Sequence, residues 1–277
     1  MNPITLIRGI LSALFMAFFL LLTNIFQVLS LVVLPFSPSL FRRWNRFAVG
    51  CWAKSTVIMM KHTSGTEVLF EGDLITQGEN AIVLPNHQSM VDIMMTVKLA
   101  ESPGRLGDIK QFAKDIIKWF PGIGWGMFFV DGIFLKRDWN RDAGTIFKTF
   151  ERLRNHKMPF WIINYPEGTR LTLKKLKSSQ EYARLKGLPI LSQVLLPRPK
   201  GFSATLMALR SELQAVYDMT IIYGKHTPSL WELLSGQVRS VRVHVKRYPI
   251  TSLPSDEAAI QSWLIERFVE KDKRLDL

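Results

Sequence analysis

The amino-acid sequence predicts an α/β domain with a largely buried sheet, carried behind an N-terminal helical membrane anchor. Two observations predict this arrangement. From Glu67 onwards, short apolar runs alternate with segments whose apolar residues recur at helical spacing, a pattern typical of strands that alternate with helices. Before that point, no charged side chain lies between Arg8 and Arg42, and most of the stretch is apolar.

The composition narrows the class of protein. Of the 277 residues, 47% are hydrophobic and 21% are charged, which excludes a disordered chain and a transporter made mostly of membrane spans. Cys51 is the single cysteine, which excludes an intramolecular disulfide and a metal site built from several cysteines. The net charge is +13, and residues 101–200 hold most of the excess, with 19 basic and 9 acidic side chains. Such a surface attracts nucleic acid, acidic lipid headgroups or phosphorylated substrates.

The uncharged N-terminal stretch predicts a permanent membrane anchor over residues 1–45. About 20 apolar residues span a bilayer as a helix, so the stretch is too long for one simple span and short for two. Asn24 and Gln27 lie near its middle and could mark a bend. The stretch lacks the short apolar region and the small-residue cleavage site of a signal peptide. Basic residues flank both ends, which favours a helical hairpin dipping into one leaflet from the cytoplasm; a single tilted span and a buried core helix are the alternatives.

Residues 46–277 are expected to form one domain, since no linker or repeat divides them. Helical spacing combined with lysines on another face predicts a basic amphipathic helix at 105–120, which lies on a membrane or packs on the core. The other expected helices lie at 88–100, 138–156, 201–213 and 256–270. Short apolar runs predict strands at 81–85, 160–166, 190–197, 219–224 and 240–250.

The first chemical motif directly follows the strand expected at 81–85 and contains His87 and Asp92. Five positions apart, the two side chains would point about 140° apart on a regular helix. They can meet if His87 lies in a turn and the helix begins after it, with Ser89 as a candidate cap. The aspartate would then fix the imidazole tautomer and leave the other ring nitrogen free to take a proton from a substrate. A structural histidine is the alternative.

Two further motifs end short apolar runs with groups that bind anions. Residues 165–170, Tyr-Pro-Glu-Gly-Thr-Arg, combine a glycine turn, a hydroxyl and a guanidinium, which suits a phosphate. Arg137 ends another apolar run and is a second candidate anion ligand. Three lysines follow the first of these motifs and are expected to be solvated or to face a membrane: Lys174, Lys175 and Lys177.

The sequence predicts neither a metal site nor a nucleic-acid partner. No histidine lies at metal-ligand spacing from another histidine or a cysteine, and the H-E-x-x-H pattern does not occur. The basic excess lacks a recognisable nucleic-acid reader motif, and a membrane anchor is an unusual companion for one.

Taken together, these segments resemble the glycerolipid acyltransferase family, of the 1-acylglycerol-3-phosphate (lysophosphatidic acid) acyltransferase type. The resemblance extends over residues 80–275 and is closest to the subgroup that includes lysocardiolipin acyltransferase and its bacterial relatives. Tyr165 departs from the wider family, which often has Phe there. Four blocks match in order: Asn86–Asp92 matches N-H-x-x-x-x-D, Gly132–Arg137 is close to G-x-I-F-x-x-R but one residue shorter, Pro166–Arg170 matches P-E-G-T-R, and Val194–Pro197 is similar to a hydrophobic run ending in proline.

The resemblance implies a glycerol-3-phosphate acyltransferase-like domain with a buried mixed sheet flanked by helices. It implies that His87 is the general base that deprotonates the free hydroxyl of a lysophospholipid, and that Asp92 orients it. The oxygen would attack the thioester of acyl-CoA or acyl-carrier protein, with no cofactor, metal or covalent acyl-enzyme. Pro197 would shape the groove for the acyl chain or the acceptor. Five residues would position the acceptor's phosphate: Arg137, Glu167, Gly168, Thr169 and Arg170.

The implied activity is acylation of 1-acylglycerol-3-phosphate to phosphatidic acid, in phospholipid biosynthesis. One alternative keeps the chemistry and changes the acceptor to lysocardiolipin or another lysophospholipid, in phospholipid remodelling. A second alternative is a lipid-binding membrane protein without catalysis. The expected partners are membrane lipids, the acyl donor and the lysophospholipid. The expected location is a membrane with the catalytic domain on its cytoplasmic face, the inner membrane in a bacterium; the lone cysteine fits a reducing compartment.

Overall fold

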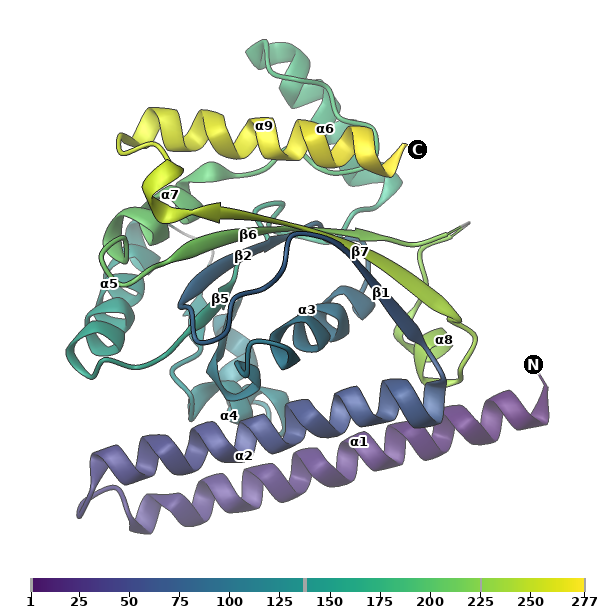
Figure 1. The fold of residues 1–277 in the computed structure, drawn as a ribbon, viewed down its shortest axis with the longest axis vertical. Helices are drawn as coiled ribbons and strands as arrows, with labels where there is room; N and C mark the ends of the chain where they lie inside the picture. Colours follow the sequence, from purple (N-terminus) through teal and green to yellow (C-terminus); the bar gives the residue numbers. More distant parts are fainter. Residues whose placement is uncertain (1, 137–138, 225, 277) are drawn as a thin grey trace.

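The structure, a computed structural model, describes residues 2–136, 139–224 and 226–276. Two long helices come first, and strands that alternate with helices follow (Figure 1). The helices are α1 (Pro3–Leu29), α2 (Pro38–Ile58), α3 (Val91–Glu101), α4 (Ile123–Phe128), α5 (Trp139–Asn155), α6 (Leu173–Lys186), α7 (Pro199–Ala208), α8 (Leu230–Leu234) and α9 (Glu257–Leu275). The strands are β1 (Glu67–Gly72), β2 (Ala81–Pro85), β3 (Ile109–Lys114), β4 (Ile133–Leu135), β5 (Trp161–Ile163), β6 (Ala215–Ile222) and β7 (Ser240–Pro249).

The strands form one seven-stranded sheet in the order β1-β7-β6-β2-β5-β3-β4. All neighbouring pairs are parallel except β6 and β7, which are antiparallel. The sheet is therefore mixed, as the resemblance implied. Five strands, β6, β2, β5, β3 and β4, run in one direction and end at the same edge, so the residues that follow them gather there.

Helices cover both faces of the sheet (Figure 1). In β2, Ala81 and Val83 pack in the core shared with α3, α8 and the first two helices, whereas Ile82 and Leu84 pack in the core shared with α5, α7 and α9. A strand buried on both faces is apolar at every position. This burial explains why β2 is a continuous apolar run and confirms the predicted α/β class.

Most of the expected elements are present with shifted ends. The strand expected at 81–85 is β2, the one at 160–166 is the shorter β5, and the one at 219–224 begins earlier, as β6. The strand at 240–250 is β7, and the four helices expected between and after the strands are α3, α5, α7 and α9.

The prediction of an amphipathic helix at 105–120 is wrong. Its centre is strand β3, which pairs in parallel with both β5 and β4. Lys110, which the helical interpretation placed on a polar face, is only 3% exposed. Pairing with two neighbouring strands outweighs the helix-like spacing, because strand formation depends on cross-strand partners that are distant in sequence.

The strand expected at 190–197 is also wrong, and this segment is irregular. Side chains rather than a neighbouring strand accept hydrogen bonds from its backbone amides. Asp272 accepts from Ser192, Gln193 and Val194, at distances between 2.6 and 3.2 Å. The next two amides, of Leu195 and Leu196, donate to Glu167 and Ser179. These side chains accept the hydrogen bonds of the backbone amides, so the apolar run is held without pairing to a neighbouring strand.

The first two helices form an antiparallel hairpin along one side of the domain (Figure 1). Each begins with a capped turn, Asn2 accepting from Ile4 and Ser37 from Leu40. Helix α1 does not break at its central polar residues. Asn24 and Gln27 are buried, and their side-chain amides donate to the carbonyl oxygens of Gly122 and Gly126 in and before α4. Helix α2 runs through residue 45 to Ile58.

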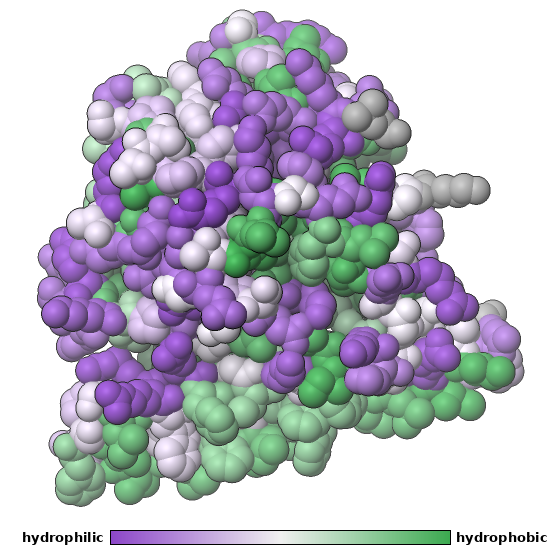
Figure 2. Space-filling view, viewed as in Figure 1, coloured by the Kyte–Doolittle hydropathy of each residue, from purple (hydrophilic) through white to green (hydrophobic). Residues whose placement is uncertain are grey.

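The segment Pro3–Val32 is long and apolar enough to cross a membrane, and only 11% of its most apolar window is buried within the protein. Figure 2 shows that apolar surface gathers along the hairpin, at the bottom of that view. Exposed apolar surface of this extent marks a membrane or protein interaction site. Its length and composition indicate a membrane-associated protein.

Candidate functional site

His87 and Asp92 meet where β2 ends. His87 lies in the loop between β2 and α3, and Asp92 lies in the first turn of α3. His87 Nδ1 is 2.9 Å from Asp92 Oδ2. The helix begins after the histidine, as the spacing required. Ser89 Oγ accepts from the Val91 amide at 3.1 Å and donates to the Pro228 carbonyl oxygen, so its hydroxyl is engaged.

Four donors hold the Asp92 carboxylate in place. Besides His87, the backbone amides of Gln88 and Ser89 donate to Oδ2 at 2.7 and 2.8 Å, and the Tyr223 hydroxyl donates to Oδ1 at 2.6 Å. Asp92 is fully buried, while the His87 side chain is 15% exposed. A carboxylate that accepts from Nδ1 places the proton on that nitrogen. Among the described residues, none hydrogen-bonds His87 Nε2, which therefore points to solvent or substrate as an acceptor.

Glu167 lies beneath the histidine loop. Its Oε1 accepts from the His87 backbone amide at 2.6 Å, and its Oε2 accepts from the Leu195 amide at 3.0 Å. The residue is only 2% exposed. Burial is the main cause that raises the pKa of the Glu167 carboxyl to about 8, against the lowering effect of the two amides. One side chain thus joins three segments that each correspond to a sequence motif.

The C-terminal helix supports the same loop from the other face of the sheet. Lys271, in α9, is 1% exposed, and its ammonium donates to the carbonyl oxygens of Leu84 and Met219 at 2.9 and 2.7 Å. It also pairs with Asp218 at 2.5 Å. Burial lowers the pKa of Lys271, and the charge of Asp218 opposes this. Since Leu84 is three residues before His87, helix α9 is tied directly to the start of the histidine loop.

The loop after Glu167 carries an exposed cationic surface beside His87. The amide of Leu171 donates to the His87 carbonyl oxygen at 2.8 Å, which holds this loop against the histidine. Arg170 is exposed, and Lys175 Nζ donates to Thr169 Oγ1 at 2.6 Å and to the Arg170 carbonyl oxygen at 3.0 Å. We name the basic side chains of this surface the cationic rim: Arg170, Lys175 and Arg198.

Arg198 and Tyr165 complete the surroundings of the histidine. Gly168 has φ of +69°, in the left-handed region that favours glycine, and a Cβ there would come within 3.5 Å of Arg198 Cδ. The Arg198 side chain therefore lies against the Gly168 turn. The Tyr165 ring packs on the His87 ring with centroids 4.3 Å apart. Burial raises the pKa of Tyr165 well above its ordinary value, so the ring beside the histidine is neutral.

The structure brings most of the predicted site residues together and gives them different structural roles. His87 and Asp92 form a pair, Gly168, Thr169 and Arg170 form the exposed loop, and Glu167 lies underneath. Pro197 is buried in the next loop, whose Arg198 amide donates to the Pro166 carbonyl oxygen at 2.8 Å. Arg137 lies outside the described residues.

Sequence reasoning missed several residues of this site. Tyr223 ends a strand that was predicted, but nothing in the pattern placed its hydroxyl on Asp92. Lys271 and Asp272 lie within the range of the resemblance, residues 80–275, but outside its four blocks. Arg198 follows the last motif directly, and its proximity to Gly168 depends on the fold. Within the described parts of the chain, no three histidine, cysteine or acidic side chains gather where they could hold a metal ion.

An oriented imidazole with a free acceptor nitrogen, beside a cationic rim, can take a proton from a substrate that carries a negative charge. This chemistry fits the known proteins that the chain resembles. The family model described as acyltransferase matches residues 67–223, and the model described as acyltransferase C-terminus matches residues 232–277.

Relatives with a known name cover nearly the whole chain. 1-acyl-sn-glycerol-3-phosphate acyltransferase 3 of Arabidopsis thaliana is 34% identical over 270 residues, which cover 92% of this chain and 70% of the relative. The delta form of the rat, Rattus norvegicus, is 36% identical over 257 residues, which cover 91% of this chain and 68% of the relative. Among solved structures, the 1-acyl-sn-glycerophosphate (LPA) acyltransferase PlsC from Thermotoga maritima has the same fold, with a TM-score of 0.56, 20% identity and 98% of both chains covered.

Proposed function

The chain belongs to the 1-acyl-sn-glycerol-3-phosphate acyltransferase family, and from that premise we propose that it transfers a fatty acyl chain from an acyl thioester to the free hydroxyl of 1-acylglycerol-3-phosphate. The product is phosphatidic acid. The observation that carries the proposal is the contact of His87 Nδ1 with the buried Asp92 carboxylate, which leaves Nε2 as the free acceptor at the surface of the site.

The reaction needs one base and one anion site. Nε2 of His87 takes the proton of the acceptor hydroxyl as its oxygen forms a bond to the thioester carbonyl carbon. The carbon–sulfur bond then breaks, and the thiolate leaves with the proton that the imidazolium returns. Asp92 stabilises the imidazolium in between. No covalent acyl-enzyme is required, and the acyl donor is acyl-CoA or acyl-carrier protein, without a further cofactor or a metal.

The cationic rim supplies the anion site. Arg170 follows the Gly168 turn and Arg198 lies against it; both residues are exposed, and a guanidinium binds phosphate in a bidentate manner. Lys175 hydrogen-bonds Thr169 in the same loop, and Arg137 would add a further cation. Glu167 has both carboxyl oxygens engaged by backbone amides, so we assign it to holding the loops and not to binding the phosphate.

The hairpin would place this chemistry at a membrane. Exposed apolar side chains line α1, and the uncharged stretch 9–41 is flanked by Arg8 on one side and by Arg42 and Arg43 on the other. That charge distribution supports a hairpin held in one leaflet, with the catalytic domain on the cytoplasmic face, the inner membrane in a bacterium. Tags at the two ends, probed with a protease in sealed vesicles, test this arrangement; ends on opposite sides would contradict it.

The proposed reaction is tested with purified protein, lysophosphatidic acid and acyl-CoA, by measuring release of the free thiol. We expect turnover in the wild type and its loss in His87→Ala. His62→Ala is the matched control, because His62 is exposed in the π-helical turn that follows α2. Full activity in His87→Ala would overturn the mechanism. A wild type that is inactive with acyl-CoA, and also with acyl-carrier protein as donor, would overturn the function.

Lysocardiolipin is a second candidate acceptor beside lysophosphatidic acid, because the cationic rim holds more than one cation. Arg170, Lys175 and Arg198 together could hold a lysophospholipid with two phosphates, such as lysocardiolipin. A competition assay with lysophosphatidic acid and lysocardiolipin separates the two functions. A clear preference for lysocardiolipin would replace phosphatidic acid synthesis by phospholipid remodelling.

A further inference from the structure

A basic cavity of about 240 Å³ lies between the hairpin and the start of β3. Its walls come from α2, from the turn before β3 and from the segments before β4 and β5. The six basic side chains that line it, histidine included, are Arg42, Arg43, Arg46, Lys110, His156 and Lys157. Two carboxylates, Asp108 and Asp131, also line it, so the cavity carries an excess of positive charge.

The two carboxylates are already engaged by arginines. Asp108 accepts from Arg46 at 2.5 and 2.9 Å and from Arg105 at 3.0 Å. Asp131 pairs with Arg152 at 3.2 Å. Within the described part of the chain, the other cations of the cavity make no ion pair. The charge of Arg42, Arg43, Lys110 and Lys157 is therefore available to a ligand.

Lys110 is the sharpest sign that the cavity binds an anion. Its side chain lines the cavity and is only 3% exposed, and its ammonium makes no hydrogen bond with any described residue. Burying an ammonium without a partner costs free energy, and here burial lowers the pKa of Lys110, while Asp131 and Asp108 act in the opposite direction. An anion in the cavity would supply the missing partner.

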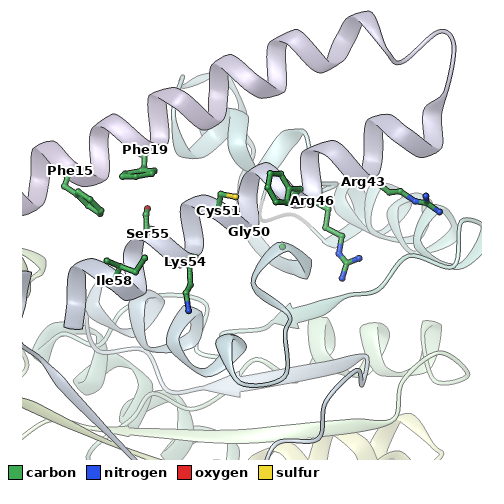
Figure 3. Close-up of a pocket in the computed structure, with 11 residues that line it drawn as sticks. Phe15, Phe19, Arg43, Arg46, Gly50, Cys51, Lys54, Ser55 and Ile58 are labelled. Carbon is green, nitrogen blue, oxygen red and sulfur yellow. The ribbon is translucent and has the colours of Figure 1, made fainter. Parts of the chain in front are cut away.

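An apolar groove of about 480 Å³ adjoins this cavity on the hairpin. The two share Arg43, Arg46 and Gly107 in their walls. Figure 3 shows Phe15 and Phe19 pointing from α1 towards α2, and Arg46 pointing away from α1 towards the body of the domain. The groove is thus apolar along the membrane-facing helices and ends at a basic cavity.

Gly107 makes this junction possible. A Cβ at Gly107 would come within 2.3 Å of the Arg46 carbonyl oxygen, so only glycine allows the turn before β3 to approach α2 this closely. The same approach brings Arg46 to Asp108 and joins the groove to the cavity.

The cavity is distinct from the proposed catalytic site. It lies where β3 begins, whereas His87 follows the end of β2, and both strands pair in parallel with β5. Lys110 stands level with Ile82 in the sheet, since both pair with Ile162. From Ile82 to the end of β2 at Pro85 the strand advances three residues, or about 10 Å, and His87 lies beyond that end.

We propose that this composite site binds an anionic phospholipid, with the phosphate in the basic cavity and the acyl chains along the hairpin groove. Charge complementarity favours this occupant, because a zwitterionic headgroup offers no net negative charge to the excess of cations. A free phosphate would fill the cavity but leave the apolar groove uncovered. The bound lipid would join the hairpin to the sheet domain and hold the protein against an acidic membrane surface. The proposal does not depend on acyl transfer.

The test measures retention of added lipid by the full-length protein in detergent, by native mass spectrometry. The probes are dioleoyl phosphatidylglycerol and dioleoyl phosphatidylcholine. We expect preferential retention of phosphatidylglycerol, weakened about tenfold in Arg42→Gln/Arg43→Gln. Arg184→Gln/Lys186→Gln removes the same charge at the exposed end of α6 and should bind as the wild type does. Equal retention of the two lipids, or equal binding by both double variants, would overturn the proposal.

Lys110→Met separates binding from folding. Methionine keeps the apolar part of the buried side chain and removes the unpartnered charge, so we expect an unchanged or raised free energy of unfolding together with about tenfold weaker phosphatidylglycerol retention. Unchanged retention would contradict the assignment. Inorganic phosphate that displaces the lipid at equal concentration would indicate a free-anion site and would also overturn it. His87→Ala should retain the lipid fully, which distinguishes this site from the catalytic one.

Discussion

The backbone amide of His87 donates to the buried carboxyl of Glu167 at 2.6 Å, and the other oxygen of that carboxyl accepts from Leu195. The histidine is therefore held from two directions, through its ring by Asp92 and through its backbone by Glu167. A base displaced by even 1 Å loses much of its effect on the rate. Three of the sequence motifs therefore contribute to holding His87: the one that contains His87 and Asp92, the one that contains Glu167, and the one that contains Leu195.

Glu167 predicts a pH dependence of stability. Its carboxyl has a pKa of about 8 in the folded protein and an ordinary value of 4.5 in the unfolded chain. Between these values the folded protein keeps a proton that the unfolded chain releases, so the free energy of unfolding falls as pH rises, by at most about 1.4 kcal/mol per pH unit. Denaturant unfolding of the wild type and Glu167→Gln in detergent should show this slope in the wild type alone. Parallel profiles would contradict it.

Substitutions of Asp92 and of its partner Tyr223 should lower kcat without unfolding the protein. Asp92→Asn removes the negative charge that holds the proton on His87 Nδ1 and stabilises the imidazolium, so kcat should fall by roughly three to four orders of magnitude. Tyr223→Phe removes one of the hydrogen bonds to the carboxylate and should lower kcat by about tenfold, with KM unchanged. A Tyr223→Phe enzyme that changes KM alone would contradict a positioning role.

Lys271 predicts that the last helix stabilises the site. Lys271→Met leaves Asp218 buried without its cation and removes one donor from each of two carbonyl oxygens, so the free energy of unfolding should fall by roughly 3–5 kcal/mol. Adding Asp218→Asn removes the stranded charge and should restore part of that loss. Chemical denaturation of both variants measures the difference. Equal stability of the single and double variants would mean that the ion pair does not couple the two residues.

The cationic rim predicts a change in acceptor binding. Arg170→Gln and Arg198→Gln each remove one exposed guanidinium from the Gly168 turn, so the KM for lysophosphatidic acid should rise about tenfold while the KM for the acyl donor stays the same. Arg184→Gln, on the last turn of α6, is the control for a lost surface charge. A fall in kcat with constant KM would place these arginines in the chemical step instead.

Local spacing allowed the His87–Asp92 pair, and the resemblance to the acyltransferase family favoured it over a structural histidine. The two residues lie five positions apart, and one turn at the end of a buried strand determines whether they meet. Strand β2 was predicted because burial on both faces makes every one of its positions apolar. The four blocks of the resemblance then located the cationic loop, which Pro166 and Gly168 turn back towards the histidine.

The sequence pattern failed where a distant partner decides the backbone. Residues 105–120 carry apolar residues at helical spacing, but the centre of the segment forms strand β3, which pairs with β4 and β5. Residues 190–197 resemble a strand, yet Asp272 and Glu167 accept their amide hydrogen bonds. In both cases the residues that pair with the segment lie elsewhere in the sequence, so the pattern of the segment alone cannot predict them.

Periodicity and composition along the chain were enough to predict the α/β class and an apolar anchor, and the close spacing of His87 and Asp92 made their pairing possible. Tertiary contacts place Glu167 beneath His87, Lys271 at the start of the histidine loop and Lys110 against a basic cavity near the start of β3. The physical reason is that burial and hydrogen-bond partners set the state of a polar side chain. Those surroundings come from elements that are far apart in sequence and meet only in the folded protein.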